Sequence, residues 1–463
     1  MGCRMESSRS AGGILQLGSF SNGKSPQESE EREESDCFPG GACIRIKELR
    51  YPDGKSGIFW RLDRLEAETQ IWLDNAPMKS YPCMGLAILL TFSCLGAGLA
   101  AEPNTPAKRH PAISLDQEAL EDLERAMKRE VREEQVSGLI GLIGWKGKIG
   151  YFESHGQRDL DEEEPMSKDS LLRIYSMTKP IVAVTAMALW EEGKFKLDDP
   201  IHKYLPEWKT VHVREGRKQV AAKRPVTPRH LMTHSAGLTY DQSELAMGPE
   251  ASLEDFSKSM AKRPLVFHPG ERYAYGYSID ILGRYLEAIE GKTLDLIMRQ
   301  RVFDKLQMSD TEFWVKNPED RSRVALVYSR KNAGGLRKVM GRDEVMRRPA
   351  RMMGGQGLMS TAGDYAKFCE MLLRKGELNG QRILREETVE LMFKNHLKDI
   401  GKSYGLGGRV NERGRYEWGG AAGTRFWVDC GKGHYAVFMI QNWGAKPKTW
   451  DIFKKHAEAA LVE

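Results

Sequence analysis

The chain places a serine and a lysine three residues apart, at Ser176 and Lys179, where an apolar helix is predicted to begin. On a helix, residues at that spacing share one face. A serine hydroxyl becomes a nucleophile when a neighbouring base takes its proton. A lysine can be that base when burial or nearby charge lowers its pKa from about 10.4. The pair therefore predicts a serine nucleophile that is activated without a histidine.

The same spacing occurs twice more, at Ser21/Lys24 and Ser259/Lys262, so spacing alone does not identify a site. The segment after Ser176 is different, because its apolar positions at 181–189 favour burial of the first helical turn. Neither of the other two pairs is followed by a helix with a long apolar face. We interpret Ser21 and Ser259 as ordinary solvated serines.

Strand and helix patterns surround the helix predicted at 177–190. A helix is expected from Ser114, with Ser114 as its N-cap, followed by a hairpin of residues 139–145 and 149–152. Further strands are expected at 410–417, 424–429 and 434–441, and a closing helix at 450–461. Strands at both ends around a helical middle predict an α+β fold. One antiparallel sheet, flanked by helices, would carry an inserted helical subdomain.

Residues 173–207, RIYSMTKPIVAVTAMALWEEGKFKLDDPIHKYLPE, resemble the nucleophile region of the serine β-lactamase and penicillin-binding-protein superfamily. They are most similar to the class C β-lactamases and the family VIII carboxylesterases. The resemblance continues in the family's order through LMTHSAGL at 231–238, HPGERYAY at 268–275, GGQGLMSTAGDY at 354–365 and WGGAAGT at 418–424. It spans most of residues 115–460 and implies the β-lactamase/transpeptidase-like fold, an acyl-enzyme and no metal or organic cofactor.

The family's second motif is a tyrosine beside the nucleophile, followed two residues on by asparagine in the β-lactamases. Tyr275-Gly276-Tyr277 matches this motif, with Tyr277 in place of the asparagine. The resemblance implies that Tyr275 shares the serine proton with Lys179 as a general acid and base. Tyr273, Tyr275 and Tyr277 also alternate as the residues of a half-buried strand would.

The third motif, Lys-Thr-Gly in the β-lactamases, is replaced here by Trp418-Gly419-Gly420, as in the family VIII esterases. The resemblance implies that these three residues and Tyr277 contact the substrate. It also implies an oxyanion hole made by the backbone amides of Ser176 and Ala421. The missing lysine argues against recognition of a β-lactam or peptide carboxylate. Arg425 is a candidate replacement, although an arginine on a strand is more often a solvated charge.

The predicted function is hydrolysis of small carboxylic esters by a serine hydrolase. Two alternatives remain open: a β-lactamase or D,D-carboxypeptidase that acts on β-lactams or cell-wall peptides, and a non-catalytic protein that binds peptidoglycan. A triad through His230, His234 or His268 is disfavoured because no Gly-x-Ser-x-Gly elbow occurs. The glycines at 354–357 lack the Gly-Lys-Ser/Thr of a phosphate loop, and indicate a turn into a helix capped by Thr361.

Composition is typical of a globular protein, and the resemblance implies a small-molecule substrate, either an ester or a β-lactam-like compound. The 70 basic and 65 acidic residues give a net charge of only +5, without a basic patch, so no nucleic-acid partner is expected. No Cys-x-x-Cys or His-Glu-x-x-His spacing predicts a metal site. Only Cys369 and Cys430 lie beyond residue 101, and their pairing stays open, as does the oligomeric state.

An uncharged apolar run at residues 84–101 follows Met78-Lys79-Ser80 and matches a secretory signal peptide. We expect residues 78–101 to direct the protein to a secreted or periplasmic location. Residues 1–77 are then expected to be upstream translation or an unstructured extension, residues 102–113 a spacer, and residues 114–463 the hydrolase domain. The alternative is an uncleaved signal anchor, with the domain attached to the membrane outside the cytoplasm.

Overall fold

The computed structural model describes residues 32–37, 43–50, 56–63 and 114–462, apart from residue 146 and residues 241–246, 332–333 and 445–447. The chain divides into two compact units, residues 1–103 and 104–463. No helix within the described ranges is long and apolar enough to cross a membrane. The predicted signal segment, residues 78–101, lies outside the described residues.

In the first unit the described residues form a three-stranded antiparallel sheet, for which the sequence pattern had indicated no fold. Its strands are β1 Arg32–Cys37, β2 Cys43–Arg50 and β3 Ser56–Asp63, in that order. The missed signal is an alternation of apolar residues: Ile44 and Ile46 of β2 pair with Leu62 and Trp60 of β3. Such a period of two is typical of a strand.

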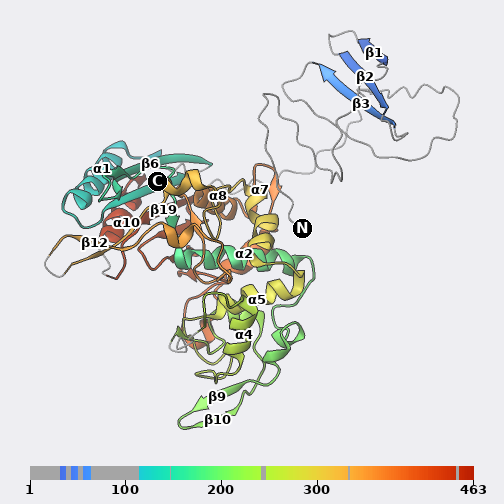
Figure 1. The fold of residues 1–463 in the computed structure, drawn as a ribbon. Coiled ribbons are helices and arrows are strands. Elements are labelled where there is room, and N and C mark those ends of the chain that lie inside the picture. Colours follow the sequence, from blue (N-terminus) through green and yellow to red (C-terminus); the bar gives the residue numbers. More distant parts are fainter. Residues whose placement is uncertain are drawn as a thin grey trace, which may run out of the picture. The chain divides into compact units, whose positions relative to one another are not determined.

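The second unit is built on a seven-stranded antiparallel sheet (Figure 1), with the order β16-β17-β18-β19-β5-β6-β7. Its strands are β5 Gly138–Trp145, β6 Lys148–Asp159, β7 Glu164–Pro165, β16 Arg409–Val410, β17 Tyr416–Gly419, β18 Arg425–Asp429 and β19 His434–Ile440. Strands β19 and β5 are neighbours, with Val437 opposite Leu142, so the two ends of the unit close the sheet. This arrangement confirms the predicted α+β fold of the β-lactamase/transpeptidase type.

Helices cover both faces of the sheet because alternate strand residues point to opposite sides. On β5, Leu139 and Ile143 pack in a core with helices α1 Gln117–Arg132 and α10 Thr449–Ala459. Leu142 packs in the opposite core with helix α8 Ala362–Leu373. The sheet is therefore the middle layer of the unit.

Helix α2, Thr178–Glu191, runs between the sheet lobe and the helical subdomain (Figure 1). Its residues from Thr178 to Leu189 are all buried, which explains why the segment is apolar on every side. The subdomain contains β9 His212–Glu215, β10 Lys218–Ala221, α3 Pro228–Met232, α4 Leu253–Ala261, α5 Ser278–Glu290 and α6 Leu294–Met298. Helix α7 Asp304–Leu306 lies beside α8 (Figure 1). The remaining elements are β4 Ser114–Leu115 with β20 Leu461–Val462, β8 Leu172–Arg173 with β13 Met359–Ser360, β11 Val327–Arg330 with β12 Leu336–Met340, β14 Glu377–Leu378 with β15 Gln381–Arg382, and helix α9 Glu386–Phe393.

The predicted helix start at Ser114 is wrong. Ser114 belongs to strand β4, which pairs with β20, and the cap of α1 is Asp116, whose side chain accepts a hydrogen bond from the Ala119 amide at 2.9 Å. The pairing of β4 with β20 also explains why the closing helix stops at Ala459, before Leu461 enters the strand.

The single strand predicted at 410–417 is also wrong, because β16 and β17 are separate strands of one hairpin. Asn411 and Gly414 form the turn between them: the Gly414 amide donates to the Asn411 carbonyl at 3.0 Å, and Gly414 has a φ of 79°. Asparagine and glycine are typical of such turns, so the signal was present in the sequence.

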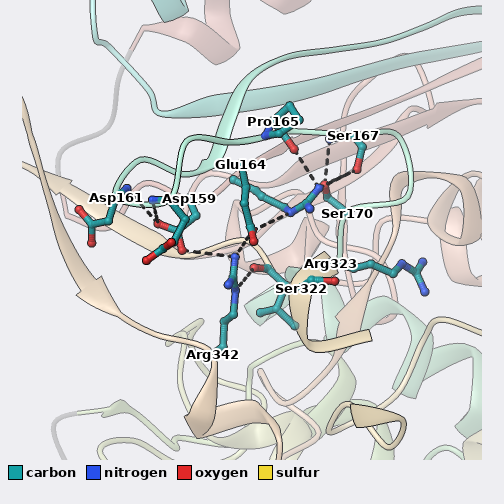
Figure 2. A network of polar contacts seen from close by, with 12 residues as sticks. Asp159, Asp161, Glu164, Pro165, Ser167, Ser170, Ser322, Arg323 and Arg342 are labelled. Carbon is teal, nitrogen blue, oxygen red and sulfur yellow. Dashed lines mark hydrogen bonds and ion pairs between the residues drawn. The ribbon is translucent and has the colours of Figure 1, made fainter. Parts of the chain in front are cut away.

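Arg342 links the segment after β12 to strands β6 and β7 of the sheet through ion pairs. Its Nη2 lies 3.3 Å from Asp159 Oδ2 and also pairs with Glu164, and its Nε donates to the Val324 carbonyl at 3.1 Å. Figure 2 shows the guanidinium pointing toward both carboxylates. The side chains of Arg342 and Asp159 are only 9% and 5% exposed, so loss of one partner leaves a buried charge.

We expect Arg342→Met to lower the free energy of unfolding by about 3 kcal/mol, because Asp159 then lacks its buried counter-charge. Chemical denaturation measures the change. Arg321 is a matched control, since it pairs with Asp343 at 2.8 Å but both side chains are largely exposed. Arg321→Met should leave the denaturation midpoint unchanged. Equal effects of the two substitutions would contradict this account.

Candidate active site

Ser176 lies in a 3-10 turn, Tyr175–Met177, that leads directly into α2. Its neighbours Tyr175 and Met177 are buried, whereas Ser176 is partly exposed. Tyr175 has a φ of 44°, in the left-handed region that non-glycine residues rarely adopt. Contacts of its ring with Trp443, at 5.3 Å between centroids, help to hold this conformation. The turn therefore presents the serine hydroxyl from a constrained backbone.

Lys179, on the first turn of α2, is fully buried and directs its amine at three oxygens. Its Nζ donates to Ser176 Oγ at 3.1 Å, to the Tyr240 hydroxyl at 3.2 Å and to the Gly355 carbonyl at 2.6 Å. An ammonium group has three donors, so these oxygens satisfy all of them. A buried lysine without such partners would carry a large desolvation penalty.

Tyr275 approaches the nucleophile from the helical subdomain. Its hydroxyl donates to Ser176 Oγ at 2.7 Å, and Lys179 Nζ lies 4.7 Å from the centre of its ring. The structure therefore brings Ser176, Lys179 and Tyr275 into one hydrogen-bonded group. Both groups beside Ser176 Oγ can exchange a proton with it, which is the geometry that general acid-base catalysis requires.

Aromatic rings surround this group. The ring of Tyr240 packs edge-on against those of Tyr275 and Tyr277, at centroid distances of 5.4 and 4.7 Å. Trp418 lies 5.5 Å from Tyr275 by the same measure. Burial, followed by the influence of Tyr275, raises the pKa of the Tyr240 hydroxyl, which therefore stays protonated. The ring of Tyr277 contacts the rings of Tyr240 and Phe256, so Tyr277 lies beside Tyr240.

Asp280 and Gly355 position Lys179, a role that no motif in the sequence indicated for either residue. The Gly355 amide donates to Asp280 Oδ1 at 2.7 Å, while the Gly355 carbonyl accepts from Lys179. A Cβ on residue 355 would lie 2.6 Å from Asp280 Oδ2, so the close approach requires glycine. Burial raises the pKa of the Asp280 carboxyl to about 6, and the charge of Lys179 opposes that shift.

The turn after β17 packs against the nucleophile turn. A Cβ on Gly420 would lie 2.4 Å from the Ile174 carbonyl oxygen, and Thr424 Oγ1 donates to the same oxygen at 3.3 Å. Ala421, the predicted oxyanion donor, belongs to this turn and is exposed. Among the described residues, neither the Ser176 amide nor the Ala421 amide has an acceptor, so both are available to a ligand. Their role as an oxyanion hole stays a prediction.

Three histidines, His230, His234 and His268, are the possible bases of a catalytic triad. His234 is buried beside the Tyr275 ring, at 4.7 Å between centroids, and neither ring nitrogen has a hydrogen-bond partner among the described residues. Burial lowers its pKa well below the ordinary value, and the charge of Lys179 lowers it further, so it is neutral. His268 pairs with Glu215 at 3.0 Å. Burial lowers the pKa of His230 to about 4. The hydrogen bonds of Ser176 go instead to Lys179 and Tyr275.

The structure also places the second Ser/Lys pair and the two cysteines of the hydrolase domain. Ser259 lies on α4, and Lys262 is the C-cap of that helix, while Ser21 and Lys24 lie outside the described residues. Cys369 and Cys430 are free thiols. No group of three His, Cys, Asp or Glu side chains is placed to hold a metal ion in the ranges that the structure describes.

The fold and the Ser-Lys-Tyr group together define a serine hydrolase of the β-lactamase type. The family model described as Beta-lactamase matches residues 123–458, and the chain belongs to this family. The resemblance seen in the motifs is therefore confirmed, and the protein is an enzyme of the serine hydrolase class.

The chain is also similar to individual curated proteins and solved structures. Protein Rv1367c of Mycobacterium tuberculosis (strain ATCC 25618 / H37Rv) is 32% identical over 351 residues, which are 66% of this chain and 86% of that protein. Esterase EstB of Burkholderia gladioli is 27% identical over 380 residues, 72% of this chain and 92% of that protein. The structure of "EstCE1, a hydrolase with promiscuous acyltransferase activity" has a TM-score of 0.65 at 23% identity, over 74% of this chain and 98% of that chain. The last similarity supports the fold.

The buried Asp280 leads to a prediction about stability and pH. A raised pKa means that the folded protein holds this proton more tightly than the unfolded chain does. The stabilising effect is complete below the ordinary pKa of 3.8 and is lost as the pH rises through about 6. Asp280→Asn has no such proton. The free energy of unfolding of the native protein, relative to this variant, should therefore fall by about 3 kcal/mol between roughly pH 4 and pH 7.

Urea denaturation at several pH values measures this difference. Asp304→Asn is the control, because the Asp304 side chain is 60% exposed and should add no comparable dependence on pH. A difference between the native protein and Asp280→Asn that stays constant across this range would contradict the assignment.

Proposed function

We propose that this protein hydrolyses small carboxylic esters through an acyl-enzyme on Ser176. The observation that carries the proposal is the position of Ser176 Oγ, 2.7 Å from the Tyr275 hydroxyl and 3.1 Å from Lys179 Nζ. Lys179 is fully buried, while Ser176 is partly exposed. A carbonyl carbon can therefore approach the oxygen from the open side while the Lys179 amine stays shielded from water.

In the proposed reaction, the Tyr275–Lys179 pair reacts in the form that lacks one proton: Ser176 Oγ attacks the ester carbonyl carbon and its proton passes to that pair. The amides of Ser176 and Ala421 stabilise the resulting oxyanion. The bond to the alcohol oxygen then breaks, and the alcohol leaves with the proton. Water attacks the acyl carbon, gives a proton to the same pair, and releases the acid from Ser176, which recovers its hydrogen.

The replacement of lysine by Trp418 favours esters over β-lactams. In the family's third motif a lysine is available to a substrate carboxylate, whereas here an indole ring packs beside Tyr275 and Tyr404. The similarity to an esterase supports the same preference. The acyl-enzyme would also pass its acyl group to an alcohol in place of water, and the acyltransferase activity in the name of EstCE1 supports this second reaction.

Assays of the full chain with short-chain p-nitrophenyl esters and a chromogenic cephalosporin test the proposal. We expect ester turnover that falls by at least about 10³-fold in Ser176→Ala, because the nucleophile is lost. Ser259→Ala is the matched control, since this serine has the same spacing to a lysine but lies on α4. It should keep full activity.

Tyrosine variants refine this test. Tyr275→Phe should lower kcat by about 10²-fold or more with little change in KM, because it removes a proton-transfer group. Tyr273→Phe, two residues away, should not. Cephalosporin turnover without ester turnover would favour a β-lactamase, and the absence of both would contradict the proposal.

We also propose that the domain acts outside the cytoplasm, directed there by residues 78–101. The support is the uncharged apolar run after Met78-Lys79-Ser80. Mass spectrometry of the native protein tests this, with a mature N-terminus expected close to residue 102. Peptides from residues 1–77 in the mature protein would contradict cleavage at that point.

A further inference from the structure

A cavity of about 250 Å³ opens on the α10 side of the sheet, next to the Trp418-Gly419-Gly420 motif. Three cations line it: Arg409 of β16, Arg425 of β18 and Lys454 of α10. Glu417 is the one acidic residue of its lining, and Trp450 supplies an apolar wall. We call this cavity the Arg425 pocket. Its lining has more positive than negative charge.

Arg425 is the unusual member of this set, because it is half-buried and lacks a counter-charge. Within the part of the chain that the structure describes, no carboxylate lies within ion-pair distance of its guanidinium. Its Nη1 donates only to the carbonyls of Gly420, at 3.4 Å, and Thr424, at 3.3 Å. Glu417 pairs with Arg409 instead. A partly desolvated guanidinium with free donors is well suited to a bidentate oxyanion.

The electrostatic surroundings of Arg425 also favour the binding of an anion. Burial lowers the pKa of Arg425, and the positive charge of Arg409 lowers it further, while Asp451, Glu417 and Tyr275 act in the opposite sense. The charged form of Arg425 therefore carries an energetic cost that the surrounding residues do not offset. An anion bound to the Arg425 guanidinium would relieve that cost.

The Arg425 pocket adjoins the candidate active site. Trp418 lines it and also lies 5.5 Å from the Tyr275 ring, and Tyr275 bonds to Ser176. Gly419 pairs with Arg425 across the strands, and a Cβ on Gly419 would lie 1.8 Å from Arg425 Nη1. The missing side chain therefore lets the guanidinium lie directly on the strand that borders the nucleophile.

We propose that the Arg425 pocket binds a carboxylate or phosphate group of the same substrate whose ester is attacked by Ser176. The inference rests on the proposed ester hydrolysis and specifies its substrate class: esters that carry a second, anionic group. Carboxylate and phosphate share the oxygen geometry that a guanidinium fork recognises.

A matched pair of substrates tests the inference with the full chain. Mono-p-nitrophenyl glutarate carries a terminal carboxylate, and p-nitrophenyl butyrate is a neutral ester with the same leaving group. We expect the native protein to prefer the glutarate, and Arg425→Gln to lower the glutarate-to-butyrate ratio of kcat/KM by about tenfold. Lys455→Gln is the control, because Lys455 is an exposed neighbour of Lys454 on α10 and does not line the pocket. A ratio unchanged by Arg425→Gln would overturn the inference.

A binding measurement separates failure of this inference from failure of the proposed function. Calorimetry on Ser176→Ala, which needs no turnover, measures the affinity for glutarate and for inorganic phosphate, with and without Arg425→Gln. Binding of either anion that is lost in Arg425→Gln supports the pocket even if no ester is hydrolysed, and the tighter anion identifies the group. Ester hydrolysis without saturable binding of either anion at about 10 mM would overturn the pocket and leave the hydrolase standing.

Discussion

The placement of one buried amine, that of Lys179, constrains the rest of the active site. A fully buried lysine is tolerated only when its donors are satisfied, and here the three acceptors come from three separate parts of the chain: the nucleophile turn, Tyr240 and Gly355. The sheet lobe, the helical subdomain and the central helix α2 must therefore converge at one point. The apolar character of α2 on every side follows from the same requirement.

A second tier of contacts holds those acceptors in place. The Asp280 carboxylate holds Gly355 by accepting a hydrogen bond from the Gly355 amide. The two groups are so close that residue 355 has no room for a side chain. Gly420 similarly lets the turn after β17 rest on the Ile174 carbonyl, two residues before the nucleophile. The reacting group thus depends on glycines that contribute no functional group of their own. Their contribution is the short distance between backbone segments.

Much of this arrangement could be predicted from the sequence where the signal is local or carried by family motifs. The helix after Ser176, the hairpin of β5 and β6, and the strands near the C-terminus follow from periodicity. Tyr275 followed from its motif alone. Tyr240 and Asp280 could not be found in this way, because their importance comes from burial beside Lys179, and the sequence separates them from it by 61 and 101 residues. Asn411 and Gly414 are residues typical of a turn, but the apolar pattern around them favours one continuous strand, so the turn was not predicted.

The third motif shows how a change in one strand alters what the site can recognise. With tryptophan at residue 418, the side chain facing Tyr275 is aromatic, so the position that holds a lysine in the β-lactamases carries no charge here. Glycine at residue 419 leaves the opposite face of the strand open, and Arg425 occupies that space. Positive charge is therefore present beside this strand, but it lies on the α10 side, within the Arg425 pocket. A substrate would meet aromatic surface next to the nucleophile and a cation only beyond the strand. An ester with an anionic group remote from its carbonyl fits that order of surfaces better than a β-lactam, whose carboxylate lies close to the bond that is cleaved.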